Sequence, residues 1–316
     1  MVTKLRLGIS TCLLGKNARY DGGHKLDHYL KDTLGAFVEW VPVCPELECG
    51  LGVPREAMHL TGDAKAPRLV TIRTGIDHTE RMLKWALKKL DALEPERLSG
   101  FIFKDGSPSS GMRAVKVYNA KGQPARNGVG IFAGEFMKRF ELLPVEDDGR
   151  LHDIDIRENF VERIFVYCRW QEFIEKDSSL KGLVSFHTEH KLIIMSHSPK
   201  ILGELGNMVA KAKNNKKEEL FRAYAKTLMG CLKIKADAKK NTNVLYHIMG
   251  YFKSLLSRDE KGELKEVIED YHNGLIPIIV PVTILKHYIR KYDEPYIKKQ
   301  YYLNPHPIEL MLRNHV

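Results

Sequence analysis

The sequence has few cysteines and no long apolar run, and these two shortages exclude several classes of protein. Five cysteines in 316 residues do not build the disulfide framework of a secreted domain. The longest largely apolar stretch, residues 275–285, contains two prolines and is far shorter than the roughly 20 apolar residues that cross a bilayer. The first residues, MVTKLRLGIS, lack the apolar core of a signal peptide. We therefore expect a cytoplasmic protein without a membrane span.

The overall composition is that of a folded chain with an excess of positive charge. Hydrophobic residues make up 43% and charged residues 28%, which excludes a disordered or collagen-like chain. Lys and Arg number 50 against 40 Asp and Glu, a formal net charge of +10. Residues 211–255 are the most basic window, with eleven basic and three acidic side chains. Such a surface favours a polyanionic partner.

The two halves of the chain have different periodicities. In the first half, apolar runs typical of strands alternate with helical stretches, at residues 5–10, 37–43, 69–75 and 98–104, with an amphipathic helix at 77–93. After the polar run EDDGRLHD the spacing becomes helical, at residues 157–173, 202–232, 242–257 and 259–273. We predict an α/β N-terminal domain with a mainly parallel sheet over residues 1–152, and a mostly α-helical C-terminal domain over residues 153–316.

Two cysteines follow predicted strands directly. Cys12 lies in GISTCLLG and Cys44 in VPVCPELECG. Ligands of open α/β sheets bind at the carboxyl ends of strands, so we expect these loops to meet. Thiols that meet there can coordinate a metal or an iron–sulfur cluster, although a free cysteine is often only a small buried side chain. Cys168 and Cys231 lie in helical patterns, and we expect both in the core.

Two further loop features carry polar groups suited to chemistry. Glu46 lies two residues after Cys44, where its carboxylate can transfer protons beside a metal or cluster that the thiolate coordinates. The alternative is an ordinary surface glutamate. The loop KDGSPSSG carries Ser107, Ser109 and Ser110, and it is either a simple turn or a nest of backbone N–H groups for an anion.

Taken together and in order, CLLGKNARYDGG, VCPELECGLGVPRE, KDGSPSSG and GVGIFAGEF resemble the thiouracil desulfurase family over most of residues 5–140. The remainder, including LVSFHTEHKLIIMSHSPKILGELG, resembles the YbgA-like domain fused to it, an arrangement similar to the bacterial tRNA 4-thiouridine desulfidases. This resemblance implies a [4Fe-4S] cluster held by three cysteines, with the fourth iron open to the substrate sulfur. It places two ligands at Cys12 and Cys44, and it implies acid/base chemistry for Glu46 and substrate positioning for Ser107.

One position departs from the family pattern. The third loop of the family reads Ser-Pro-Ser-Cys-Gly, whereas this chain has Ser110 at the place of the third cluster ligand. An alcohol is a poor ligand for a soft metal site. Three explanations stay open: an introduced Cys→Ser change, a natural loss of cluster binding, or replacement of the ligand by Cys49. We favour the introduced change, because every other motif position matches the family.

The basic window also contains aromatic side chains. Lys and Arg alternate there with Phe221, Tyr224, Tyr246, Tyr251 and Phe252, which provides charge for phosphates and rings on which bases can stack. The alternative is a set of solvated helix faces. We predict that tRNA containing 4-thiouridine is the partner, bound through Lys211, Lys213, Lys216, Lys217, Arg222, Lys239 and Lys240.

Three histidines, His187, His190 and His197, share one face if their segment is helical. No nearby cysteine or established carboxylate completes a zinc set with them, so we expect capping or hydrogen-bonding roles for them.

The sequence therefore predicts an enzyme that converts 4-thiouridine in tRNA to uridine and releases sulfide without net redox change. Two alternatives remain: a desulfidase of free thiolated bases or nucleosides, and a non-catalytic RNA-binding protein with a decayed cluster site. Ser110 is the main argument for the second alternative.

Overall fold

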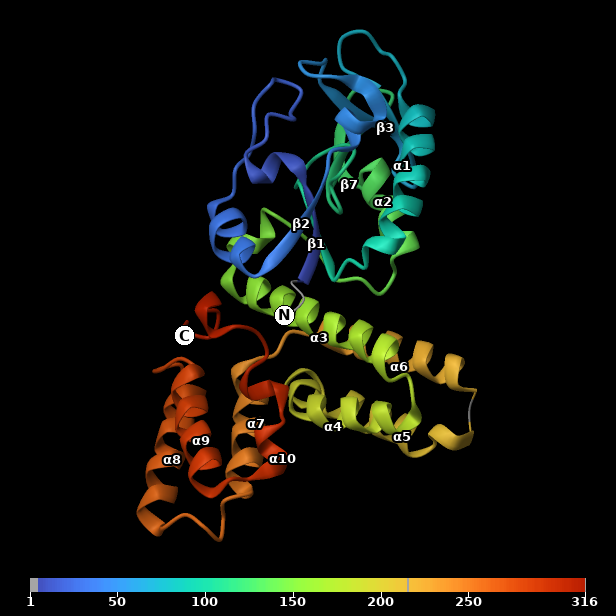
Figure 1. Cartoon of the computed structure of the whole chain (residues 1–316). Helices are drawn as coiled ribbons and strands as arrows, with labels where there is room; N and C mark the ends of the chain where they lie inside the picture. Colours follow the sequence, from blue (N-terminus) through green and yellow to red (C-terminus); the bar gives the residue numbers. More distant parts are fainter. Residues whose placement is uncertain (1–4, 215, 316) are drawn as a thin grey trace. The chain divides into compact units, whose positions relative to one another are not determined.

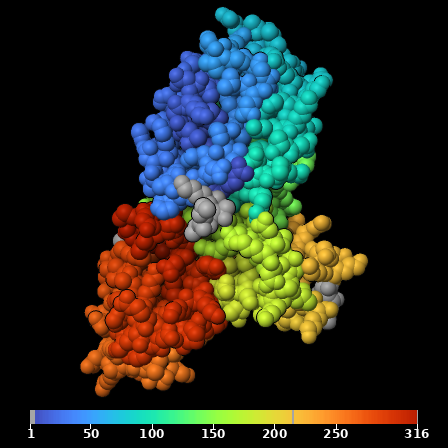
Figure 2. Space-filling view, viewed as in Figure 1, coloured from blue at the N-terminus to red at the C-terminus, as the bar shows by residue number. Residues whose placement is uncertain are grey.

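The computed structural model describes residues 5–214 and 216–315, and the chain divides into two compact units after Asp153 (Figure 1). The first unit contains the strands and two long helices, whereas the second consists of helices. This confirms the expected fold class. In Figure 2 the surface of the first unit runs from blue to green along the sequence, and that of the second from yellow-green to red.

Sheet A of the first unit is entirely parallel. Its strands run in the order β2-β1-β5-β8, with β1 at Leu5–Ser10, β2 at Val38–Val43, β5 at Gly100–Phe103 and β8 at Val145–Asp147. Strands β1 and β5 are buried along nearly their whole length, as expected where both faces of a parallel sheet are covered. The carboxyl ends of β1, β2 and β5 therefore lie side by side at one edge.

Sheet B is a second, mixed sheet that the sequence did not predict. Its order is β4-β3-β6-β7, with β3 at Met58–Asp63, β4 at Ala66–Thr71, β6 at Val115–Tyr118 and β7 at Pro124–Gly128. The run expected at 69–75 to join the parallel sheet is instead the second strand of the β3–β4 hairpin. The reason is the connection of two residues between β3 and β4, because a parallel pair needs a crossover of a dozen or more residues.

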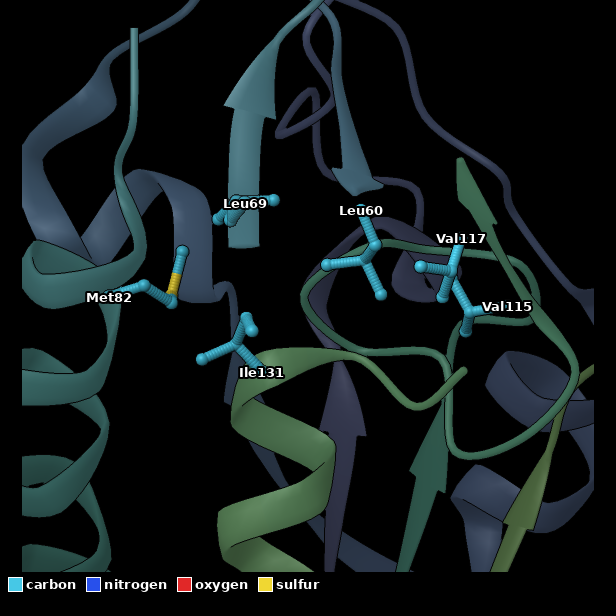
Figure 3. Packing of buried hydrophobic residues seen from close by; sticks show 6 residues of the cluster. All are labelled: Leu60, Leu69, Met82, Val115, Val117 and Ile131. Carbon is cyan, nitrogen blue, oxygen red and sulfur yellow. The ribbon is translucent and has the colours of Figure 1, made fainter. Parts of the chain in front are cut away.

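One face of sheet B packs on helices α1, Thr79–Leu93, and α2, Ile131–Arg139. Figure 3 shows the buried side chains of this contact, which are Leu60, Leu69, Met82, Val115, Val117 and Ile131. Successive residues of a strand point to opposite faces. Consequently His59, Lys116 and Tyr118, which alternate with the buried residues, lie on the other face of sheet B.

Helix α2 also packs on sheet A. Phe132 and Phe136 of α2 contact Phe101 and Phe103 of β5, with ring centroids of Phe101 and Phe136 4.6 Å apart. Helices α1 and α2 lie side by side on one flank of the unit (Figure 1). Through its aromatic side chains and Ile131, α2 ties the two sheets together.

The second unit is built from eight α-helices within the residues that the structure describes. They are α3 Ile154–Lys176, α4 Leu180–His197, α5 Pro199–Ala210, α6 Lys217–Leu232, α7 Ala238–Gly250, α8 Arg258–His272, α9 Ile279–Tyr292 and α10 Pro295–Lys298. The single helix expected at 202–232 is two helices, α5 and α6, and the one expected at 242–257 ends at Gly250. Across residues 5–214 and 216–315, no helix has the length and apolar character needed to cross a bilayer.

Helices α4 and α9 were not predicted from the sequence. Buried residues of α4 occur on most sides of the helix, so no amphipathic stripe marks it. In α9, Pro281 is the third residue, a position in the first turn where the missing N–H leaves no hydrogen bond unmade. The prolines of this segment are therefore compatible with a helix start.

Candidate active site

Three strand-end loops of the first unit line one cavity of about 340 Å³. Cys12 follows β1 in a short 3₁₀ helix, Cys44 and Glu46 follow β2, and the loop after β5 carries Ser107 and Ser110. The backbone N–H of Lys104 donates to the Ser10 hydroxyl at 2.9 Å, which fixes the β5 loop to the end of β1. The structure thus brings together the five residues that the sequence singled out for this site.

Glu46 lies at the centre of a set of polar contacts. Its Oε1 accepts hydrogen bonds from the hydroxyls of Ser109, at 2.5 Å, and Ser107, at 3.4 Å. Its Oε2 lies 3.8 Å from Nη2 of Arg55 and accepts from the Cys44 thiol at 3.7 Å. The carboxylate is therefore held in one orientation toward the cavity.

The sequence did not predict the contacts of two of these partners, Ser109 and Arg55, with Glu46. Ser109 is fully buried, and the Arg55 side chain is 9% exposed. Arg55 also donates to the backbone oxygens of Ala18, at 3.2 Å, and Gly52, at 3.0 Å. The only signal in the sequence was the presence of both residues inside the motifs SPSSG and GVPRE.

The serine loop is packed closely against the start of α2. The N–H of Ser110 donates to the Ser107 hydroxyl at 3.1 Å, and the N–H of Gly130 donates to the Gly111 oxygen at 2.7 Å. A Cβ at Gly130 would lie only 2.5 Å from the backbone carbonyl of Ser109. Glycine is therefore required at 130, because any side chain would displace the loop that carries the site serines.

The two site thiols are poorly solvated. Burial raises the pKa of the Cys12 thiol to about 11, against the opposing charge of Lys104. Burial also raises the pKa of Cys44 to about 12, and the negative charge of Glu46 adds to the effect. Both thiols are consequently protonated at neutral pH in this structure, and a metal that binds them must displace two protons.

Cys49 lies outside this lining. Its thiol donates to the backbone oxygen of Glu46 at 3.3 Å, and its side chain packs against the buried cluster drawn in Figure 3. Among the described residues that line the cavity, those with a sulfur atom are Cys12, Cys44 and Met58. This position does not favour Cys49 as a replacement ligand.

The donors in the cavity fit an iron–sulfur cluster at two positions and not at the third. Such clusters are held by cysteine thiolates, which Cys12 and Cys44 can supply, whereas Ser110 offers a hydroxyl. Across the described part of the chain, no group of three or more His, Cys, Asp or Glu side chains is arranged to hold a metal ion. With Ser110 in the lining, the cavity has two cysteine thiols in place of the three that the family pattern implies.

The cavity wall also carries positive charge. Arg19, Arg55 and Lys104 line it. The Lys104 ammonium lies 2.8 Å from Asp148, whose carboxylate also accepts from the N–H of Asp105 at 2.6 Å. A carboxylate, hydroxyls, thiols and cations thus surround one cavity.

Comparison with known proteins divides the chain as the structure does. Residues 7–148 match the family model for 2-thiouracil desulfurase, and residues 191–307 match the model for a protein of unknown function, DUF1722. The protein YbbK of Bacillus subtilis (strain 168), itself uncharacterised, is 31% identical over 108 residues, which are 33% of this chain and 71% of YbbK. The chain belongs to the 2-thiouracil desulfurase family. This confirms the resemblance that the loop motifs indicated.

Two further proteins are similar to parts of this desulfurase-family chain. The uncharacterised protein YbgA of Escherichia coli (strain K12) is 27% identical over 153 residues, which are 48% of this chain and 90% of YbgA. A solved structure of the [4Fe-4S]-dependent thiouracil desulfidase TudS has 29% sequence identity. It covers 48% of this chain and 95% of its own, with a TM-score of 0.39. The desulfurase and YbgA-like parts are thus joined in one chain.

The basic residues predicted to bind RNA lie in the second unit of this desulfurase-family chain. They lie between α5 and α6, on α6 and at the start of α7. Lys216 lies 3.7 Å from Glu219, and Lys240 lies 3.2 Å from Asp237. The remaining predicted residues are exposed: Lys211, Lys213, Lys217, Arg222 and Lys239.

The prediction that the rings of this window are available to bases is wrong for three of the five. Phe221, Tyr224 and Phe252 are buried. Tyr224 stacks on Trp170 with ring centroids 5.4 Å apart. Residues 221 and 224 are three apart and share one face of α6, and that face packs into the core.

The three histidines of α4 have the hydrogen-bonding roles that were expected. His187 contacts the Tyr224 hydroxyl at 2.9 Å, and His190 contacts the backbone oxygen of Phe186 at 2.7 Å. His197 lies 2.6 Å from the buried Glu162 carboxylate. These rings are therefore built into the core of the second unit.

Proposed function

We propose that this chain is a desulfidase that converts 4-thiouridine in tRNA to uridine and releases sulfide. The observation that carries the proposal is the cavity in which Cys12, Cys44, Glu46 and Ser107 meet, in a chain of the 2-thiouracil desulfurase family. In the reaction, water adds to the thiocarbonyl carbon, a C=O bond replaces the C=S bond, and the sulfur leaves as hydrogen sulfide. Neither carbon nor sulfur changes oxidation state.

The proposal includes an iron–sulfur cofactor. Cys12 and Cys44 would hold two irons of a [4Fe-4S] cluster, and residue 110 is the position for the third ligand. When bound, the cluster supplies a Lewis-acidic iron that makes the substrate sulfur a better leaving group. Because Ser110 lacks a thiolate, we expect this chain to load a cluster poorly as it stands.

In this proposal, Glu46 carries out the proton transfers of the reaction. Its carboxylate accepts a proton from the attacking water and then returns it to the departing sulfur. The hydroxyls of Ser107 and Ser109 and the guanidinium of Arg55 keep the carboxylate directed at the cavity. Ser107, which also lines the cavity, is the residue proposed to position the substrate ring.

In this proposal the second unit contributes RNA affinity. The exposed cations at Lys213, Lys216, Lys217 and Lys239, together with Lys240, support this part, because each phosphate contact releases counterions. Neutralising all five as glutamines is expected to weaken tRNA binding at least tenfold at moderate salt, an estimate of about 1.4 kcal/mol. Binding of tRNA by this variant and by the unchanged chain is compared by filter retention or anisotropy. Equal affinities would contradict the role of these lysines.

The proposed activity is tested with Ser110→Cys. The unchanged chain and the variant are reconstituted anaerobically, iron and sulfide are counted, and sulfide release is measured from 4-thiouridine tRNA and from free 2-thiouracil. We expect about four irons and turnover of tRNA by the variant, with less iron in the unchanged chain. Cys49→Ser in the variant background is the control, and we expect its iron content to stay the same.

The outcomes separate the proposal from its alternatives. A fully loaded Ser110→Cys protein that releases no sulfide from either substrate would refute the desulfidase function. Release from free 2-thiouracil alone would instead make this chain a desulfidase of free bases.

A further inference from the structure

A second cavity adjoins the candidate active site in the first unit. It has a volume of about 620 Å³. Five residues line both cavities, namely Met58, Ile72, Asp105, Gly106 and Pro108. The loop 105–108, which leads into the site serines, is thus a wall of both spaces. The second cavity, which we call the sheet B groove, therefore lies directly beside the active site.

The floor of the sheet B groove is the outer face of sheet B. The inner face is apolar and packs on α1 and α2 (Figure 3). On the outer face, the rings of His59 and Tyr118 stack on each other with centroids 4.7 Å apart and an angle of 26°. Both rings are half-buried and line the groove. They offer a flat aromatic surface beside the site.

Two cations face each other across this floor. Lys116 of β6 and Arg126 of β7 are directly paired in the antiparallel register, and both line the groove. Like charges directly opposite in a sheet are destabilising. Within residues 5–214 and 216–315, neither side chain has a carboxylate partner. The pair is therefore a local excess of positive charge, and an anion bound there would offset the repulsion.

The two other arginines that line the groove are paired with carboxylates. Arg113 pairs with Asp147 at 3.7 Å, and Arg150 pairs with Glu146 at 2.9 Å. Asp105 is the remaining acidic side chain of the lining. The excess positive charge of the groove is thus concentrated at Lys116 and Arg126, next to the ring pair. Proteins that bind single-stranded nucleic acids combine cations for the backbone phosphates with aromatic rings on which the bases stack.

We propose that the sheet B groove binds the RNA strand that flanks the thiolated nucleotide. A backbone phosphate lies between Lys116 and Arg126, and a neighbouring base stacks on the His59–Tyr118 pair. The inference rests on the proposed function for the identity of the nucleotide in the active site. It assigns part of the RNA contact to the catalytic unit itself, in addition to the lysines of the second unit.

The test neutralises the cation pair. The double variant Lys116→Gln with Arg126→Gln is compared with Lys84→Gln with Lys88→Gln, which removes the same charge from exposed positions of α1 outside both cavities. The probe is a short single-stranded RNA with one 4-thiouridine and a fluorescent label. Its affinity is measured by anisotropy over a range of salt concentrations, without any need for the cluster.

We expect the groove variant to bind the RNA about tenfold more weakly than the control variant. The slope of log affinity against log salt should fall by about 0.7, because one neutralised phosphate is lost on a single strand. Thermal unfolding should show no loss of stability, because a repulsive pair has been removed. Weaker binding without weaker folding is a combination that a purely structural pair cannot produce. Tyr118→Ala should also weaken RNA binding, with a smaller effect on the salt slope.

Turnover measurements distinguish a failure of this inference from a failure of the proposed function. In the Ser110→Cys background, the groove variant should lose activity on the RNA and retain it on the free 4-thiouridine nucleoside. RNA affinity and salt slope equal to those of the control variant would overturn the inference, and the cations would then serve only to protect the edge strand β7 from pairing. Absence of turnover in every variant would refute the proposed function. The RNA affinities would then still test whether the groove binds RNA.

Discussion

At the scale of single residues, the site is organised around one carboxylate. Glu46 receives two serine hydroxyls and lies close to a thiol and a guanidinium. The thiols beside it are protonated because burial raises their pKa. Glu46 is therefore the charged group of the site best placed to move a proton.

Replacement of Glu46 by Gln is expected to reduce turnover by a factor of about 10² to 10⁴, since the amide cannot accept a proton from water. The Ser109 hydroxyl can still donate to the amide oxygen, so the iron content of the Ser110→Cys background should not change. Sulfide release and iron are measured together. Glu80→Gln on the exposed side of α1 is the control for the loss of one carboxylate. Full activity in Glu46→Gln would remove this residue from the mechanism.

The convergence of site residues could be predicted from the sequence where each residue directly follows a strand. Cys12 and Cys44 each follow a strand of the parallel sheet, and such strand ends meet by the geometry of the fold. The contact of Ser109 with Glu46 joins residues 63 apart in the sequence. This contact depends on the conformations of two loops, and hydrophobic periodicity does not predict loop conformation.

At the scale of elements, the start of α2 determines the position of the serine loop. Three backbone N–H groups at the start of this helix, those of Gly130, Ile131 and Ala133, donate to carbonyls of residues 108–111. The loop is thus held by a helix terminus rather than by its own side chains alone.

Gly130→Ala is expected to destabilise the chain by about 1–3 kcal/mol, because its Cβ would overlap the Ser109 carbonyl. Gly134→Ala is the matched control in the same helix. Its Cβ would find its nearest neighbour at 3.7 Å, and we expect it to stabilise the helix by about 0.5–1 kcal/mol. Urea unfolding and sulfide release are measured for both. Equal stability of the two variants would contradict the close approach of loop and helix.

The sequence was least informative for elements without an amphipathic stripe. Helix α4 buries residues around most of its circumference, and α9 begins within a proline-containing apolar run. Conversely, α1 has a clear apolar stripe, and the expected range of 77–93 differs from the observed Thr79–Leu93 by two residues. Periodicity identifies a helix with one buried face and misses a helix buried on several.

At the scale of the whole molecule, the core of the second unit contains histidines that make its stability depend on pH. Burial lowers the pKa of three histidines of the second unit, to about 4 for His187, about 3 for His190 and about 4 for His306. In the unfolded chain these rings return to their ordinary value of 6.5. Below pH 6.5 the unfolded state therefore binds more protons than the folded state.

We predict that the second unit loses stability as the pH falls from 6.5 toward 4, at roughly 1 kcal/mol per pH unit for each buried histidine. Burial alone would raise the pKa of Glu162, but the hydrogen bond and charge of His197 outweigh it and lower the pKa to about 2. Its own contribution is therefore kept until the pH falls below about 4.5, the ordinary value of a glutamate, and is lost toward pH 2.

The acid effect can be measured in the second unit alone. The chain has three tryptophans, and with Trp40→Phe and Trp85→Phe only Trp170 remains, which stacks on Tyr224 beside His187. Urea midpoints from Trp170 fluorescence should fall between pH 7.5 and pH 5. The same series in a His190→Gln variant should show a smaller slope. Midpoints that do not change with pH would contradict the burial of neutral histidines.

The shared wall of the two cavities has a consequence for how this molecule can diversify. Sulfur chemistry is assigned to loops of sheet A, whereas the cations and one ring of the sheet B groove lie on the β6–β7 hairpin, and residues 105–108 line both cavities. A hairpin at the edge of a sheet accepts insertions and new side chains without disturbing the parallel core. Exchange of this hairpin is thus a route by which evolution or an engineer can change the molecules admitted to the site while the cysteine loops stay as they are.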